Sequence, residues 1–154
     1  MSNLLLENYI KYIIKNEPIN TLHIYDFDMT LYDHEKEDWI MNIVAELQNS
    51  LKDPQTRVIL CTARTNKTEH IMSTEELLNQ NNMSLNDFDQ CYFKSEYRKE
   101  KAPIYKSHVI LDEICANDNI AYVKFWDDRE DTLEQVRIDL ERHNSNIEYT
   151  PVKC

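Results

Sequence analysis

Two aspartates separated by one residue follow an apolar run near the start of the chain. Asp26 and Asp28 come directly after Leu22–Tyr25, and Thr30 follows two residues later. Alternate side chains of a strand share a face, so the three side chains would converge if the chain stayed extended. Such a pair could supply reactive carboxylates. The same residues are also typical of a solvated turn after a strand, so the pair alone leaves both interpretations open.

Three later segments place polar residues where an apolar segment ends or a helix begins. Because ligands of open parallel sheets bind outside the carboxyl ends of the strands, we expect these residues to meet Asp26 and Asp28 at one edge. Taken singly, each has a simpler interpretation, as a helix cap or a surface charge. The segments are Thr62-Ala63-Arg64 after one apolar run, Lys106 near a helix start, and Asp127-Asp128-Arg129 after another apolar run.

This set of side chains suits phosphoryl transfer. A carboxylate can attack phosphorus and form an aspartyl-phosphate, while a second carboxylate protonates the leaving oxygen and later deprotonates water. Attack of one anion on another needs a metal, and magnesium prefers carboxylates, carbonyls and water. A hydroxyl and an ammonium can hold the phosphoryl oxygens while charge redistributes.

Strand-like and helix-like patterns alternate along the chain, which predicts an α/β fold, a parallel sheet covered by helices on both faces. The absence of glycine excludes the glycine-rich phosphate loops of nucleotide-binding folds. We expect one domain over residues 1–154, with an N-terminal helix over 2–16 packed on the core. The predicted strands are 22–27, 57–61, 90–93, 122–126 and an edge strand at 147–152; the other predicted helices are 39–51, 73–80 (begun by a capping box at Ser73), 103–116 and 130–143.

Composition narrows the class of protein. The first residues do not resemble a secretion signal, and no apolar run is long enough for a membrane span. The four cysteines lack metal-ligand spacing and resemble core thiols of a reducing, cytoplasmic compartment. The lack of glycine has no structural explanation; coding bias in an AT-rich genome, such as that of a virus or intracellular microbe, would account for it.

The formal charge of −11 argues against broad coating of nucleic acid. It leaves room for binding one phosphorylated end. A local basic cluster surrounds the third segment, and apart from Lys106 its simpler interpretation is a set of solvated charges. The cluster consists of Lys94, Arg98, Lys99, Lys101 and Lys106, diluted by Glu96 and Glu100.

The sequence resembles the haloacid dehalogenase (HAD) superfamily, whose four motifs look present in order. The matching residues are Asp26-Phe27-Asp28-Met29-Thr30 for the first motif, Thr62 for the second, Lys106 for the third and Asp127-Asp128 for the fourth. The resemblance covers residues 22 to about 140 and implies a three-layer, Rossmann-like fold. The gaps before Thr62 and before Lys106 are filled by predicted core elements, so we expect no cap domain.

The resemblance implies roles for these residues. Asp26 would be the nucleophile, and Asp28 the general acid/base. Thr62 and Lys106 would hold the phosphoryl group. Asp26, Asp127, Asp128 and the backbone carbonyl of Asp28 would bind Mg²⁺. The second aspartate is typical of phosphatases rather than dehalogenases.

Two positions depart from the family pattern. Met29 and Ala63 stand where the family often has glycine. Alanine is small enough for backbone to approach a phosphate, but Met29 would be strained if its position needs a positive φ.

A closer resemblance joins the chain to the HAD domains of RNA-repair proteins and to the 3′-phosphatase domain of polynucleotide kinase. It implies hydrolysis of a 3′-phosphate on an RNA or DNA end. Arg64 and Arg129 would contact the phosphate or order the acidic site, and Ala63 is a further candidate for substrate binding. Arg129 could equally form a salt bridge with Asp127 or Asp128. The alternatives are a phosphatase for nucleotides, other metabolites or phosphoproteins, and a binding module without activity. In an oligomer, a neighbouring subunit could cover the site in place of a cap domain.

Overall fold

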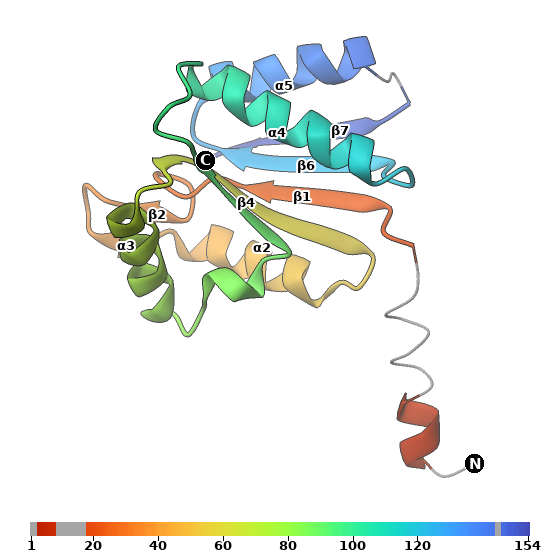
Figure 1. Cartoon of the computed structure of the whole chain (residues 1–154). Coiled ribbons are helices and arrows are strands. Elements are labelled where there is room, and N and C mark those ends of the chain that lie inside the picture. The colour runs from red at the N-terminus through yellow and green to blue at the C-terminus, as the bar shows by residue number, and fades with distance from the viewer. Residues whose placement is uncertain (1–2, 9–17, 144–145) are drawn as a thin grey trace.

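The computed structural model describes residues 3–8, 18–143 and 146–154, and its centre is a five-stranded parallel sheet (Figure 1). The strand order β5-β4-β1-β6-β7 puts the first strand in the middle, and every neighbouring pair is parallel. The predicted α/β fold with a parallel sheet is therefore confirmed. The strands are β1 (Thr21–Tyr25), β4 (Thr56–Thr65), β5 (Gln90–Lys94), β6 (Tyr122–Asp127) and β7 (Glu148–Lys153).

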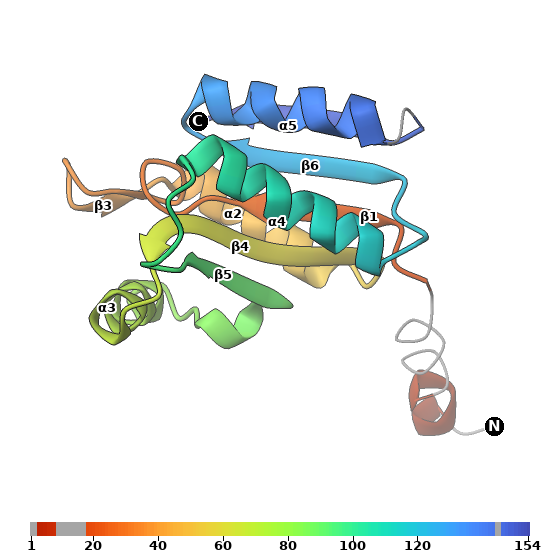
Figure 2. The same cartoon turned by 45° about the horizontal axis from the view of Figure 1, so that its top comes forward.

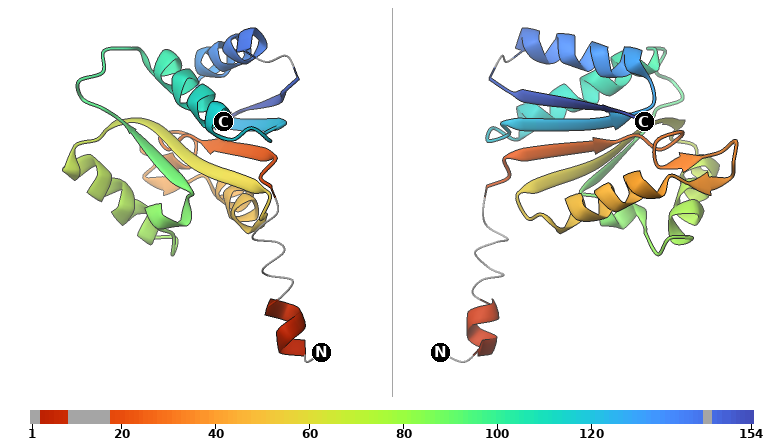
Figure 3. Two further views of the ribbon diagram at one scale, coloured as in Figure 1. Left: turned by 45° about the vertical axis from the view of Figure 1, so that its right-hand side comes forward. Right: turned by 180° about the vertical axis from the view of Figure 1, so that it is seen from behind.

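Helices cover both faces of this sheet, as Figure 2 and the two views of Figure 3 show. α4 (Ala102–Ala116) and α5 (Glu130–His143) pack on one face over Ile24 and Phe125, while α2 (Met41–Lys52) and α3 (Thr68–Asn79) pack on the other over Tyr25 and Leu60. Alternate residues of β1 thus enter different cores, because successive strand side chains point to opposite faces.

The connections between the core elements are short. A two-stranded hairpin of β2 (Tyr32–Asp33) and β3 (Asp38–Trp39) precedes α2, and the 3-10 helix η1 (Leu85–Asp87) precedes β5. Within the described residues, no cap domain interrupts the chain between β1 and β4 or between β4 and α4. The helices in the described ranges are too short or too polar to cross a membrane.

Two predicted helix starts are wrong. Trp39 belongs to β3 and pairs with Tyr32, so α2 begins at Met41 rather than residue 39. The predicted capping box at Ser73 is absent because α3 begins at Thr68, and Ser73 lies inside the helix with its hydroxyl on the carbonyl of His70. Helical periodicity detects the apolar face but not the turns that precede it.

The N-terminal helix falls mostly outside the described part of the chain. Residues 3–8 are helical with exposed side chains, and residues 9–17 lie outside the described ranges. Packing of this helix on the core therefore stays a prediction.

Candidate active site

The polar residues singled out in the sequence gather at the carboxyl edge of the sheet. Tyr25 is in register with Leu60 of β4 and Trp126 of β6. The next residues along these strands are therefore neighbours, and the backbone N–H of Asp26 donates to the carbonyl of Trp126 at 3.0 Å. Parallel pairing brings Asp26 beside Asp127.

A buried lysine joins the two carboxylates at this edge. Lys106 Nζ lies 2.9 Å from Asp26 Oδ1 and 2.7 Å from Asp127 Oδ2. All three residues are at most 4% exposed. Burial raises the pKa of Asp26 to about 7 despite the attraction of Lys106, and burial also raises the pKa of Asp127. Burial alone would lower the pKa of Lys106, but the two carboxylates outweigh it and raise that pKa.

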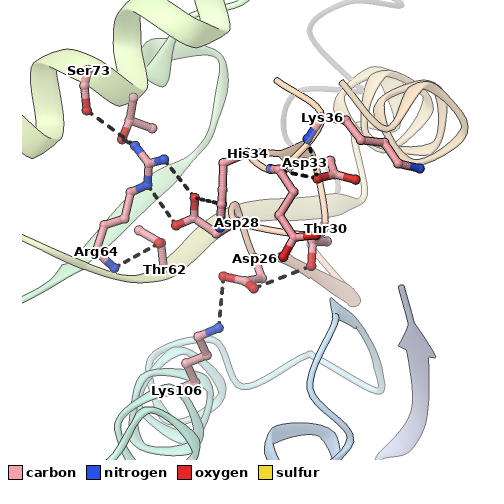
Figure 4. A network of polar contacts seen from close by, with 12 residues as sticks. Asp26, Asp28, Thr30, Asp33, His34, Lys36, Thr62, Arg64, Ser73 and Lys106 are labelled. Atoms are coloured by element: carbon pink, nitrogen blue, oxygen red, sulfur yellow. Dashed lines mark hydrogen bonds and ion pairs between the residues drawn. The ribbon is translucent and has the colours of Figure 1, made fainter. Parts of the chain in front are cut away.

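The second carboxylate of the first motif has a different partner (Figure 4). Arg64 Nε and Nη2 each donate a 2.8 Å hydrogen bond to Asp28, and its guanidinium also lies 4.6 Å from the centre of the Phe27 ring. Arg64 Nη1 reaches Thr74 Oγ1 on α3 at 3.1 Å. The arginine therefore fixes Asp28 by a planar, two-point contact from β4.

A tight turn begins at Phe27 and contains Asp28, so the two aspartates do not stay on one extended face. Met29 has a φ of 60°, and the N–H of Leu31 donates to the carbonyl of Phe27 at 2.9 Å. The position does need a positive φ, which costs a residue with a Cβ roughly 1 kcal/mol. Thr30 turns back toward the first aspartate, and its Oγ1 lies 3.5 Å from Asp26 Oδ2.

A pocket of about 220 Å³ opens above these residues. It brings together nearly all the predicted site residues. Asp127 lies outside its lining, 0% exposed behind Lys106, and Arg64 lines a neighbouring pocket with Ala63. The lining residues are Asp26, Asp28, Met29, His34, Thr62, Ala63, Ala102, Lys106, Asp128 and Arg129.

Thr62 and Arg129 contribute hydroxyl and cationic groups to this lining. The Thr62 hydroxyl, near the end of β4, accepts a 3.1 Å hydrogen bond from the N–H of Arg64. The Arg129 side chain pairs with Asp131 at 2.6 Å, and only its backbone N–H contacts Asp127, at 2.8 Å. The alternative of a salt bridge from Arg129 to Asp127 or Asp128 is therefore wrong.

His34 is a site residue that sequence analysis missed. Its Nδ1 lies 3.5 Å from Asp28 Oδ1, and its ring lines the pocket. The only signal in the sequence is its position in the loop that follows the first motif.

Three carboxylates at this edge fit a divalent cation. One oxygen each from Asp26, Asp127 and Asp128 lies within 4.8 Å of the others. The Lys106 ammonium contacts Asp26 and Asp127, and carboxylate oxygens are ligands that suit Mg²⁺. The carboxylate of Asp28 is not part of this group, because Arg64 holds it.

The chain matches the model of one protein family. The model of the family described as HAD domain family 1 in Swiss Army Knife RNA repair proteins matches residues 12–153. No curated protein is significantly similar to the chain.

Among solved structures, one titled "Structure of the Pnkp1/Rnl/Hen1 RNA repair complex" superposes with a TM-score of 0.65 at 19% identity, covering 88% of this chain and 43% of that one. The chain thus spans less than half the length of this structural relative. Pantothenate synthetase from Thermus thermophilus aligns with a TM-score of only 0.44 at 10% identity, over 94% of this chain and 59% of that one.

Proposed function

The chain belongs to HAD domain family 1 of Swiss Army Knife RNA repair proteins, and from this premise we propose that it is a Mg²⁺-dependent phosphomonoester hydrolase acting on the 3′-phosphate of nucleic-acid ends. The family match confirms the resemblance to HAD domains of RNA-repair proteins. The single observation that carries the proposed chemistry is the position of Asp26, which lines the pocket with Lys106 and Thr62 beside it.

In the proposed first step, a carboxylate oxygen of Asp26 attacks phosphorus, and the bond from phosphorus to the leaving oxygen breaks. Asp28 in its protonated form gives its proton to that oxygen. The product is an aspartyl-phosphate and a free hydroxyl end. Arg64 positions Asp28 for this transfer through its two hydrogen bonds.

In the second step, Asp28 accepts a proton from a water molecule as that water attacks phosphorus. The acyl-phosphate bond breaks, which restores the Asp26 carboxylate and releases inorganic phosphate. The two aspartates thus have separate proposed roles, and each contacts a different cation, Asp26 Lys106 and Asp28 Arg64.

The groups around the pocket would hold the phosphoryl oxygens. Thr62 offers a hydroxyl, Lys106 an ammonium, and Ala63 a backbone that a phosphate can approach because its side chain is small. Arg129, half exposed at the rim, would add a cation. Asp26, Asp127 and Asp128 would hold Mg²⁺, which when bound would offset the repulsion between a carboxylate and the phosphate.

The family and the open pocket together support a polynucleotide end as substrate. The relative with the same fold is described as part of an RNA repair complex, and no cap domain covers the pocket within the described residues. A bulky chain end can enter such a site. Phosphorylated nucleotides, other metabolites or phosphoproteins are the second candidate class, favoured by the formal charge of −11.

A substrate panel tests the proposal. Phosphate release is measured from a 3′-phosphorylated oligoribonucleotide, its 5′-phosphorylated isomer, nucleoside monophosphates, sugar phosphates and a phosphopeptide, each with Mg²⁺. We expect the highest kcat/KM for the 3′-phosphorylated oligonucleotide. A preference for the small molecules or the peptide would refute the proposed substrate and leave the phosphatase chemistry in place.

A further inference from the structure

The loop between β5 and α4 has surface chemistry that the phosphatase site does not use. It runs from the carboxyl end of β5 to the start of α4 (Figure 2). Ala102, the first residue of α4, lines the catalytic pocket. Tyr97 on this loop is 84% exposed, the highest value for any large apolar side chain in the described ranges. An aromatic ring so open to water, on a loop that leads to the catalytic pocket, suits contact with a ligand.

Two lysines of the same loop have no acidic partner within the described part of the chain. The loop carboxylates are already paired: Glu96 lies 3.8 Å from Lys67, and Glu100 receives two-point hydrogen bonds from Arg98. Lys99 and Lys101 are exposed and have no ion pair among the residues that the structure describes. The loop therefore presents net positive charge in a protein whose formal charge is −11.

A second hollow adjoins the catalytic pocket at Ala63. It measures about 390 Å³ and shares Ala63 with the catalytic pocket. The chain just beyond its lining is tied to the loop, because Asn66 N–H donates to Lys94 O at 2.9 Å and Asn66 Oδ1 accepts from the N–H of Glu96 at 3.4 Å. Asn66 thus links the end of β4, which lines this hollow, to the start of the loop.

The geometry points to the loop of residues 95–101 as a binding platform for the single strand that precedes the terminal phosphate, with a base stacked on Tyr97 and backbone phosphates on Lys99 and Lys101. This inference rests on the proposed function. Single strands are bound by such combinations of aromatic rings and cations, because every base has a stacking face and every linkage a negative charge. A small phosphorylated metabolite in the catalytic pocket would not reach these side chains.

Kinetics with two substrates test the platform. The substrates are a single-stranded oligonucleotide of about six residues with a 3′-phosphate and a nucleoside 3′-monophosphate. We expect Tyr97→Ala to lower kcat/KM for the oligonucleotide about 5- to 100-fold while leaving the monophosphate unchanged. The double change Lys99→Ala/Lys101→Ala should reduce the salt dependence of oligonucleotide binding by about 1.4 in log K per log salt.

Matched controls lie at the opposite, amino end of the sheet. Tyr122→Ala removes a tyrosine that is 49% exposed at the start of β6, and Lys52→Ala removes an exposed lysine at the end of α2. Neither change should affect the ratio of the two kcat/KM values.

The outcomes separate this inference from the proposed function. If the loop variants keep the wild-type ratio of oligonucleotide to monophosphate activity, the platform is refuted and the phosphatase remains. If wild-type protein releases phosphate from no substrate, the proposed function fails. Binding still tests the platform in that case. Fluorescence anisotropy compares the affinity of the oligonucleotide for the Asp26→Asn variant with and without the loop substitutions at Tyr97, Lys99 and Lys101. Lower affinity with the loop substitutions supports the platform, and unchanged affinity refutes it.

Discussion

The guanidinium of Arg64 holds the carboxylate of Asp28 by two hydrogen bonds of 2.8 Å, which join β4 to the loop after β1. Asp28 is 31% exposed at the pocket, so without this partner its side chain could sample several rotamers. The pair fixes the position of the proposed proton donor.

Loss of this two-point contact should reduce turnover more than stability. We expect Arg64→Lys to lower kcat by about 100-fold, because an ammonium cannot hold both oxygens and a misplacement near 1 Å costs that much. Arg57→Lys is the matched control, since Arg57 makes the same kind of contact with Glu113 away from the pocket. Equal kcat in the two variants would mean that Arg64 does not position Asp28.

Asp26→Asn should abolish turnover and leave the fold intact. The amide cannot attack phosphorus, so we expect kcat to fall by at least about 1,000-fold. Burial raises the pKa of Asp26 to about 7, so its ionisation above that pH opposes folding, and the variant should melt no lower than wild type at pH 8. Phosphate release at the wild-type rate would remove Asp26 from the nucleophile role.

Mg²⁺ should stabilise the folded protein through the three carboxylates at the sheet edge. A cation at 100 times its Kd adds about 2.7 kcal/mol to the free energy of unfolding, which a thermal melt in Mg²⁺ and in chelator would detect. Asp128→Asn should reduce the Mg²⁺-dependent rise in Tm, whereas Asp118→Asn, an exposed site after α4, should not. Equal rises in both variants would contradict the proposed metal site.

We expect the free energy of unfolding to fall in mild acid because of His23. Burial, with a smaller effect of Lys124, lowers its pKa from 6.5 to about 4, while its Nδ1 shares a hydrogen bond of 2.7 Å with Ser50 Oγ. The unfolded chain therefore binds this proton first, and stability falls as pH drops from about 6.5 to about 4, by about 2 kcal/mol given partial exposure of the ring.

The comparison of wild type with His23→Gln isolates this contribution. Asp26 and Asp127, whose pKa values are raised, act with the opposite sign over part of the same range. Urea unfolding at several pH values should show a difference between the two proteins that changes between pH 6.5 and 4. A constant difference would exclude His23 as its source.

Met29→Gly should stabilise the turn that contains Asp28 and Met29. Met29 has a φ of 60°, which glycine adopts without a Cβ clash, so we expect the free energy of unfolding to rise by about 0.5–1 kcal/mol. Asn82→Gly is the control: its φ is 55°, but asparagine tolerates this region, and a smaller change should follow. Denaturant midpoints of the two variants would decide between these expectations.

Local pattern was enough to predict the strands and the edge at which the site lies. The buried run before Asp26 and the apolar runs before Thr62 and Asp127 correspond to β1, β4 and β6. A parallel sheet aligns the carboxyl ends of its strands, so residue types at those ends predict neighbours without knowledge of side-chain contacts. α4 was predicted to within one residue at its start, because Pro103 occupies its first turn.

Only the tertiary structure decided which charges pair. The Asp28 side chain could have faced a metal, yet Arg64 from another strand holds it. Arg129 pairs with Asp131 rather than with Asp127. Lys106 lies between two carboxylates that are far from it in sequence. Long side chains have several partners within reach, and the choice depends on through-space distance and burial, which no local pattern encodes. The sequence by itself determined the chemistry available at the sheet edge, and the packing of the strands and of α4 decided how that chemistry is arranged.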